Sequence, residues 1–394
     1  MGIKSLFCLV LTVLMASFAA AQVPCSGTIL PQATLFVNWP QFQYDATHSG
    51  CNPYESILSP STVGNLAVDW TYSSHNGEGY YSPVLANGIV YVGSNYNTNS
   101  GYLYALNAKT GEFVWKFDPG GGVIAAPAVA NGLVYVGSMG GGLYALNALT
   151  GVLVWSYPTG LVFSSPTVKN GVVYVDSNDS YLYALNAATG ALLWRSTVRG
   201  GSSSPAVANG MVYVGSIYAT VYALDATTGA QAWTYTTGNQ VSSSPSVAGG
   251  VVYVGCDDGN VYALDARTGA LRWKYTTSGQ GQFDSSPAVA DGVVYVGSGG
   301  IPDYNLYALN ASTGALIWKY TTGLITENAP VVANGVVYFP GYDGNAYALN
   351  ARTGALLWKD AISTAQNNSP AVANGVVYFG SIDHHVYAFH LPGQ

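Results

Sequence analysis

Charged residues are scarce in this sequence of 394 amino acids. They make up 8% of the chain, against about 25% in an ordinary globular domain. A disordered chain would also be poor in aromatic residues, but here they reach 13% beside a hydrophobic content of 49%. The composition therefore excludes disorder and indicates a large buried interior. With 12 basic against 19 acidic residues, a nucleic-acid partner is not expected.

Long apolar runs are also missing. The N-terminus combines Lys4, an apolar run from about Leu6 to Leu14 and the small residues Ala19-Ala20-Ala21. This pattern is typical of a secretory signal peptide, and the run is shorter than the roughly 20 residues of a membrane helix. We therefore expect residues 1–21 to be removed. The mature protein is expected to be exported, to the periplasm or outside the cell, without a transmembrane segment.

Cysteine is rare as well, with four in the chain. Cys8 lies in the predicted signal peptide, which leaves an odd number in an exported protein. Cys25 and Cys51 flank a leader without repeats, predicted at residues 22–65, which would gain from a disulfide in an oxidising compartment. We predict a Cys25–Cys51 disulfide and a lone thiol in a turn at Cys256. The alternative is a Cys51–Cys256 bridge across the variable loops.

A repeat of about 40 residues fills the chain from residue 66 to residue 394. Each copy contains Asn-Gly or a relative of it, then Tyr-Ala-Leu or Tyr-Ala-Phe, and all but the last end in Thr-Gly, three residues and Trp. The Gly-containing pairs supply hairpin turns, so each copy predicts four short antiparallel strands. A proline in the first strand marks that strand as an inner edge. The repeated tryptophans are Trp115, Trp155, Trp194, Trp233, Trp273, Trp318 and Trp358.

The last copy, from about residue 368, has three strands and no Trp. A Trp-bearing segment at residues 66–72, which contains Trp70, precedes the first copy. It can supply the missing fourth strand, which would close the ring and remove exposed sheet edges. We therefore predict an all-β, eight-bladed β-propeller over residues 66–394, with its last blade closed by the N-terminal strand.

The segments NARTGALLWK, DARTGALRW and NAKTGEFVW resemble the tryptophan-docking repeat of the quinoprotein, or PQQ-like, propeller superfamily. The resemblance implies that Trp70 and the seven repeated tryptophans lock neighbouring blades together. The superfamily contains PQQ-dependent dehydrogenases and non-enzymatic scaffolds such as BamB-like lipoproteins. The dehydrogenases pair two adjacent cysteines beside the cofactor and bind calcium, whereas this chain has short loops and no Cys-Cys pair. Cys25 follows Gln-Val-Pro, which does not fit a lipoprotein signal.

The loops at one end of the blades vary between copies, so we expect ligand specificity there. These loops are rich in acidic residues, which favours an acidic funnel for a cation or a basic segment of a partner. Hairpin turns also favour Asp, which is the alternative for several of them. Asp284 and Glu327 are the stronger candidates because no turn rule requires them. The candidate binding residues are Glu78, Asp257, Asp258, Asp284, Glu327, Asp343 and Asp383.

These observations favour a monomeric, exported scaffold for binding or assembly, with a protein or a cell-surface glycan as its partner. No catalytic residue and no metal site are assigned. His384 and His385 are adjacent, so on a strand they would face opposite ways. No cofactor is expected. The alternative is a PQQ-dependent dehydrogenase, which would need PQQ and calcium.

Overall fold

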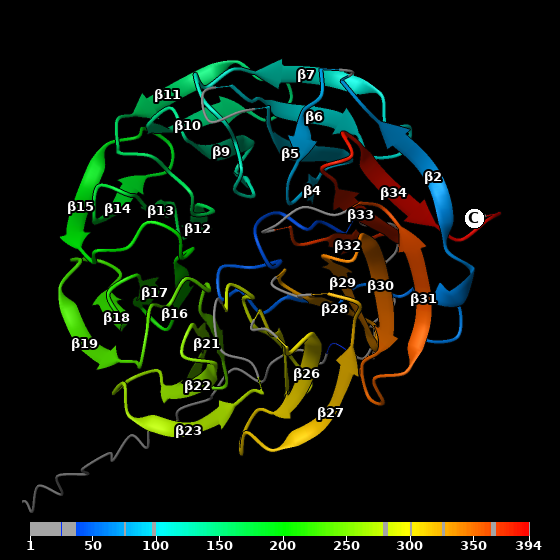
Figure 1. The fold of residues 1–394 in the computed structure, drawn as a ribbon. Helices are drawn as coiled ribbons and strands as arrows, with labels where there is room; N and C mark the ends of the chain where they lie inside the picture. Colours follow the sequence, from blue (N-terminus) through cyan, green and yellow to red (C-terminus); the bar gives the residue numbers. More distant parts are fainter. Residues whose placement is uncertain are drawn as a thin grey trace, which may run out of the picture.

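The structure is a computed structural model. It describes residues 25, 37–74, 76–96, 100–278, 283–299, 302–324, 328–363 and 368–393, so the predicted signal peptide lies outside the described residues. Within these ranges no helix is long and apolar enough to cross a membrane. Eight antiparallel sheets stand around a central axis as the blades of a propeller (Figure 1).

The strands of each blade are named from the axis outward. Blade 1 contains β4 (Val84–Ala86), β5 (Ile89–Asn95), β6 (Leu103–Asn107) and β7 (Phe113–Phe117). Blade 2 contains β8 (Ala128–Ala130), β9 (Leu133–Ser138), β10 (Gly142–Asn147) and β11 (Leu153–Tyr157). Blade 3 contains β12 (Thr167–Lys169), β13 (Val172–Asp176), β14 (Tyr181–Asn186) and β15 (Leu192–Thr197). Blade 4 contains β16 (Ala206–Ala208), β17 (Met211–Ser216), β18 (Thr220–Asp225) and β19 (Gln231–Thr236).

Blade 5 contains β20 (Ser246–Ala248), β21 (Val251–Cys256), β22 (Asn260–Asp265) and β23 (Leu271–Thr276). Blade 6 contains β24 (Ala288–Ala290), β25 (Val293–Gly297), β26 (Asn305–Asn310) and β27 (Leu316–Thr321). Blade 7 contains β28 (Val331–Ala333), β29 (Val336–Gly341), β30 (Asn345–Asn350) and β31 (Leu356–Ala361). Blade 8 contains β32 (Ala371–Ala373), β33 (Val376–Gly380), β34 (Val386–His390) and β2 (Ala67–Tyr72). Outside this pattern lie β1 (Cys51–Asn52), β3 (Gly79–Tyr80) and the short 3-10 helix η1 (Val63–Asn65).

The ring closes where the two ends of the described propeller meet. Strand β2 pairs antiparallel with β34, and Trp70 lies opposite Ala388. Figure 1 shows the blue β2 beside the red β34, next to the C-terminus. The predicted eight-bladed propeller, with its last blade completed by the N-terminal strand, is confirmed.

Each outer-strand tryptophan docks on the next blade around the ring. The indole Nε1–H of Trp233 donates to the carbonyl of Ala266 at 3.0 Å. A Cβ added to Gly269 would lie 2.7 Å from the Trp233 ring, and the φ of Gly269 is 74°, so only glycine fits at this turn. The other bonds of this kind join Trp70 to Ala108, Trp115 to Ala148, Trp155 to Ala187, Trp194 to Ala226, Trp273 to Ala311, Trp318 to Ala351 and Trp358 to Leu66.

A buried tyrosine adds a second bond to the same docking carbonyl. The hydroxyl of Tyr213, on the second strand of blade 4, donates to Ala266 O at 3.0 Å. Tyr295 does the same to Ala351 O at 3.1 Å. Tyr338 of blade 7 differs, because its buried hydroxyl has no hydrogen-bond partner. Its docking blade is blade 8, where the break between β34 and β2 replaces the usual turn.

Candidate functional site

The leader passes around the axis and bonds to the innermost strand of every blade. In blade 1, Leu85 N donates to Trp39 O at 2.8 Å, and in blade 7, Val332 N donates to Gly50 O at 2.7 Å. The bonds between these two run from Val129 N to Pro40 O, from Val168 N to Gln41 Oε1, from Val207 N to Ala46 O, from Val247 N to Thr47 O and from Val289 N to Ser49 O. The Asn52 amide completes the circuit by donating to Val372 O of blade 8. Residues 39–52 therefore cover the central axis at the end that carries the Asn-Gly turns, opposite the variable loops.

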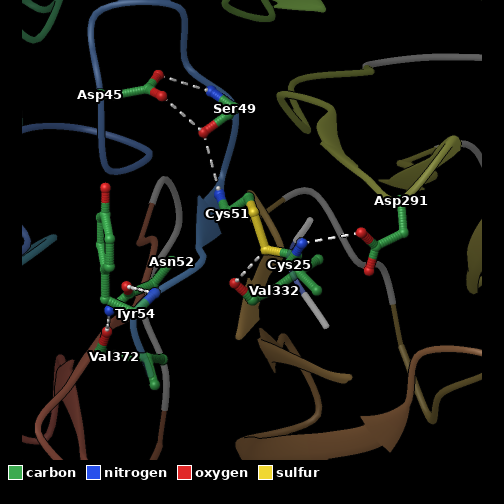
Figure 2. Close-up of a disulfide and its surroundings, with 9 residues drawn as sticks. All are labelled: Cys25, Asp45, Ser49, Cys51, Asn52, Tyr54, Asp291, Val332 and Val372. Carbon is green, nitrogen blue, oxygen red and sulfur yellow. Dashed lines mark hydrogen bonds between the residues drawn. A yellow bond between two sulfur atoms is a disulfide. The ribbon is translucent and has the colours of Figure 1, made fainter. Parts of the chain in front are cut away.

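A disulfide joins two parts of the leader, and a hydrogen bond from one of its cysteines reaches blade 6. Cys25 and Cys51 are bonded, and Cys25 N donates to Asp291 Oδ1 at 2.8 Å (Figure 2). Cys256 is a free, buried cysteine at the end of β21, rather than in the turn that follows. Burial raises the pKa of its thiol to about 11, so Cys256 is an inert thiol at neutral pH.

His48 of the leader ties two innermost strands together across the axis. Its Nδ1 lies 3.1 Å from Pro245 O, and its Nε2 lies 3.0 Å from Thr167 Oγ1. Because a carbonyl can only accept, Nδ1–H is the donor and the Thr167 hydroxyl donates to Nε2. Burial lowers the pKa of His48 to about 4, so the ring is neutral and serves the structure.

A cavity of about 350 Å³ lies on the axis above the leader, on the side of the variable loops. Its inner wall is formed by the residues that precede the recurring prolines, and Phe42 reaches it from the leader. These wall residues are Ser82, Ala126, Ser165, Ser204, Ser244, Ser286, Ala329 and Ser369. Further out, the cavity is lined by residues that stand three positions before a proline, namely Ile124, Phe163, Ser202, Ser242 and Asp284. Spacing by two residues places both sets on one side of the chain.

The wall serines bind the blades to one another. Ser165 N donates to Ser204 Oγ at 2.9 Å, and Ser204 N donates to Ser244 Oγ at 2.9 Å. The serine before each of these bonds to its own blade, as where Ser243 Oγ donates to Gly255 O, and Ser203 Oγ also donates to Ser243 O of the next blade. The described residues of the lining include no histidine that could act as a base for a serine. The paired serines thus have a structural function in the ring.

Asp284 is the one charged residue among the described residues that line the cavity. Burial and the nearby Asp257 raise the pKa of Asp284 to about 6, while a hydrogen bond from Ser242 opposes this rise. Asp257 itself accepts from Phe283 N at 2.7 Å and from the Gln240 amide at 2.5 Å. Two of the predicted acidic residues therefore lie close together, and Asp284 is at the cavity wall.

Most other acidic candidates are bonded within their own blade. Asp258 and Asp383 each accept from the tyrosine four residues later, Tyr262 at 2.5 Å and Tyr387 at 2.6 Å. Asp343 accepts from its tyrosine, Tyr347, in the same way. These three carboxylates therefore hold the turn between the second and third strands.

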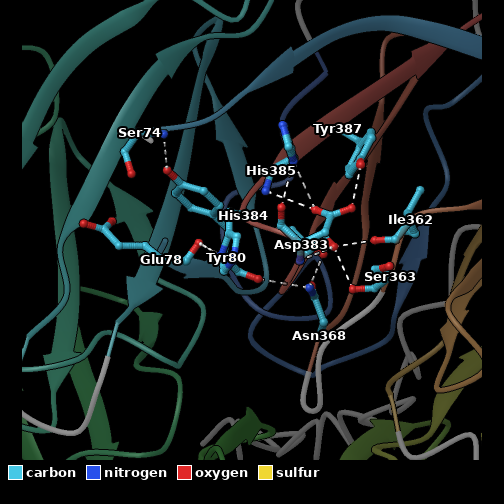
Figure 3. A network of polar contacts seen from close by, with 12 residues as sticks. Ser74, Glu78, Tyr80, Ile362, Ser363, Asn368, Asp383, His384, His385 and Tyr387 are labelled. Carbon is cyan, nitrogen blue, oxygen red and sulfur yellow. Dashed lines mark hydrogen bonds and ion pairs between the residues drawn. The ribbon is translucent and has the colours of Figure 1, made fainter. Parts of the chain in front are cut away.

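Glu78 is buried and accepts from Ser94 Oγ at 2.8 Å and from Tyr104 OH at 2.9 Å. Its carbonyl contacts His384 Nδ1, whereas His385 Nδ1 contacts Asp383 O (Figure 3). The two histidines thus have different partners. Glu327 lies outside the described residues. Among those described, no group of three or more His, Cys, Asp or Glu could hold a metal ion.

The sequence analysis did not predict several of the lining residues, namely the apolar Phe42, Phe163 and Ile217 and the amide of Gln240. A comparison of the repeats could have indicated Phe163. The position three residues before each proline varies between blades, whereas the residue next to the proline stays small. Phe42 gave no such signal, since the leader has no repeat to compare.

The comparisons with known proteins agree with this geometry. A family model described as "Outer membrane protein assembly factor BamB" matches residues 63–177, 101–201 and 178–392, which together span most of the chain. The chain belongs to this family of PQQ-like propellers. No curated protein sequence matches it.

Solved structures that resemble this PQQ-like propeller include two dehydrogenases and BamB. Quinohemoprotein alcohol dehydrogenase ADHIIG from Pseudomonas putida HK5 has a TM-score of 0.76 at 18% identity, over 95% of this chain and 83% of that one. A europium-containing methanol dehydrogenase has a TM-score of 0.75 at 14% identity, over 90% and 98%. BamB from Moraxella catarrhalis has a TM-score of 0.67 at 19% identity, over 82% and 99%. At these identities the likeness concerns the fold alone.

The described cavity residues do not suit PQQ and calcium. PQQ is a polycarboxylate, but no Lys or Arg lines the cavity, and Asp284 would repel it. Calcium takes six to eight oxygen ligands, commonly including several Asp or Glu carboxylates, whereas the described lining offers the one carboxylate of Asp284 beside neutral Ser hydroxyls.

Proposed function

We propose that this PQQ-like propeller is an exported, non-catalytic scaffold that holds a partner against its variable-loop face. The observation that carries this proposal is a group of exposed, large apolar side chains in the loops of that face, of which Ile217 also lines the axial cavity. Their members are Tyr96, Leu161, Ile217, Tyr218, Leu324 and Ile382. Such side chains are costly to expose and mark interaction surfaces when they gather on one face.

The family description and the likeness to BamB support a protein partner. The repeated turns at the other end of the blades are nearly the same in every copy, so they suit a structural task. The loops on the variable face differ from blade to blade, which a specific interface requires.

The cavity gives no support to catalysis. Among the described lining residues no histidine lies beside a serine, and the carboxylate of Asp284 lies near a second carboxylate, that of Asp257. We therefore propose that the protein works without PQQ. Export fits the N-terminal sequence pattern and the Cys25–Cys51 disulfide, because such bonds persist in oxidising compartments.

Photo-crosslinking in the native host tests this proposal. A photo-reactive amino acid is placed at Tyr218 on the variable face, where the side chain is 59% exposed, or at Leu149 on the opposite face, where it is 68% exposed. We expect one discrete adduct from position 218 and none from position 149. Adducts from position 149 alone, or no adduct from position 218, would contradict the proposal.

A further inference from the structure

We propose that the axial cavity receives the cationic end of a ligand, an ammonium or guanidinium group such as a lysine or arginine side chain of the partner. This inference rests on the proposed function, because it names the chemistry that the variable face recognises. It depends on Asp284, on unused hydrogen-bond acceptors in the wall and on two phenylalanine rings.

The charge of the cavity is uncompensated. Among the described residues Asp284 is the sole charged one in the lining, and no Lys, Arg or His of these residues forms an ion pair with it. The nearby Asp257 adds a second negative charge. Replacing water around a buried carboxylate is unfavourable unless a cation or hydrogen bonds compensate. A cationic ligand group would supply that compensation.

The wall also offers oxygen acceptors, which a donor-only cation needs. Ser204 and Ser244 each accept one backbone N–H at Oγ, and a hydroxyl oxygen has two lone pairs. Ser369 lines the cavity, is 3% exposed and has a hydroxyl without any hydrogen-bond partner. The Oγ of Ser369 is buried in the wall, and rotation of this side chain would bring its unused hydroxyl to a polar ligand group in the cavity.

Phe42 and Phe163 supply aromatic surface to the same cavity. A ring face attracts an ammonium or guanidinium group, and the apolar stem of a lysine packs well on it. An anion would be repelled by Asp284. A neutral sugar would leave the carboxylate without a counter-charge, so a cationic side chain suits all three features best.

Calorimetry with a matched pair of probes tests the inference on the full mature chain. Nα-acetyl-L-lysine amide carries the ammonium group, and Nα-acetyl-L-norleucine amide has the same stem without the charge. We expect saturable binding of the lysine probe and no binding of the norleucine probe. Equal binding of the two probes, tighter binding of N-acetylglucosamine, or no binding of the lysine probe would overturn the inference.

A matched pair of variants places the site. Asp284→Asn removes the cavity carboxylate, and we expect it to weaken binding of the lysine probe at least about tenfold, as for a desolvated charge pair. Asp118→Asn removes an exposed carboxylate from the same face and should leave the affinity unchanged. An unchanged affinity in Asp284→Asn would overturn the inference.

The wild-type pH profile gives a readout that needs no variant. Affinity should fall as Asp284 protonates below a pH of about 6, with Asp257 as the nearby carboxylate that shares this titration. A flat profile would count against the inference. The proposed function is judged separately, by the adduct at position 218. If that adduct persists while the lysine probe does not bind, the face is correct and the ligand chemistry is wrong.

Discussion

At the residue scale, the ring depends on one contact made eight times. The contact is an indole N–H that donates to a carbonyl of the next blade. At every junction except that between blades 7 and 8, a tyrosine hydroxyl donates to the same carbonyl, as Trp233 and Tyr213 do at Ala266. The indole also packs on the glycine of the same turn. Because the three groups belong to two blades, each such cluster holds neighbours in register.

Trp233→Ala should remove one of these clusters. We expect a loss of about 3–5 kcal/mol of unfolding free energy, the usual cost of truncating a buried aromatic residue. Trp233→Phe keeps a ring but loses the bond to Ala266, so it should cost less. Denaturant unfolding measures both variants. An unchanged midpoint for Trp233→Ala would show that the indole does not lock the blades.

Tyr338 and Tyr295 form a natural pair for testing the hydroxyl. Tyr295→Phe removes a bond to Ala351 O and leaves that carbonyl one donor short, which should cost about 1 kcal/mol. Tyr338→Phe removes a buried hydroxyl without a partner, so it should be neutral or stabilising. Thermal unfolding compares the two. Equal losses would mean that Tyr338 has a partner in solution.

Asp284 should make stability depend on pH. Its pKa in the folded protein is about 6, above the usual 3.8, so the folded state holds its proton to higher pH than the unfolded state. Stability should therefore fall as pH rises from about 4 to about 6, by on the order of 2–3 kcal/mol. Asp284→Asn should abolish this fall and be more stable than wild type at pH 8. Parallel melting curves of the two proteins across that range would contradict this role of Asp284.

At the element scale, two N-terminal segments hold the ring closed. Strand β2 completes blade 8 at its outer edge, and residues 39–52 join the innermost strands around the axis. The Cys25–Cys51 disulfide fastens the second of these segments. The closure therefore acts at both the outside and the inside of the propeller.

Deleting residues 22–72 should expose the edge of β34 and free the inner strands, so the protein should aggregate or unfold. The double variant Cys25→Ser/Cys51→Ser keeps both segments and serves as the control. It should fold, with a loss of about 3 kcal/mol for a closed loop with a sequence separation of 26 residues. Size-exclusion chromatography and thermal melting separate the two cases. A monomeric deletion protein with an unchanged melting temperature would show that neither segment is needed.

The sequence predicted one of these segments and not the other. Counting tryptophans revealed that the last blade lacked one and that Trp70 was left over, because a repeat makes a missing part visible. Residues 39–52 follow no repeat, and their bonds depend on a ring that exists only after folding. The surroundings of the acidic candidates were likewise only partly predictable from the sequence. Asp258 and Asp383 follow the Asp-to-Tyr spacing of their own turns, whereas the environment of Asp284 depends on neighbouring blades.

At the scale of the whole molecule, the propeller is closed at one end of its axis and has a cavity toward the other. The leader covers the axis at one end, and the axial cavity lies toward the variable-loop end with Asp284 in its wall. The loops on that side carry exposed apolar residues. This arrangement suits the capture of a partner better than the chemistry of a polycarboxylate cofactor, for which the described cavity has no basic residue.

Calorimetric titration of the mature protein with PQQ in the presence of calcium tests this central claim most directly. A quinoprotein dehydrogenase needs tight, saturable binding of that cofactor, whereas a non-catalytic scaffold with this cavity should give no saturable heat. The lysine probe, titrated into the same sample, serves as the positive control for an open cavity. Stoichiometric binding of PQQ that depends on calcium would contradict the scaffold function and favour the function of a PQQ-dependent dehydrogenase.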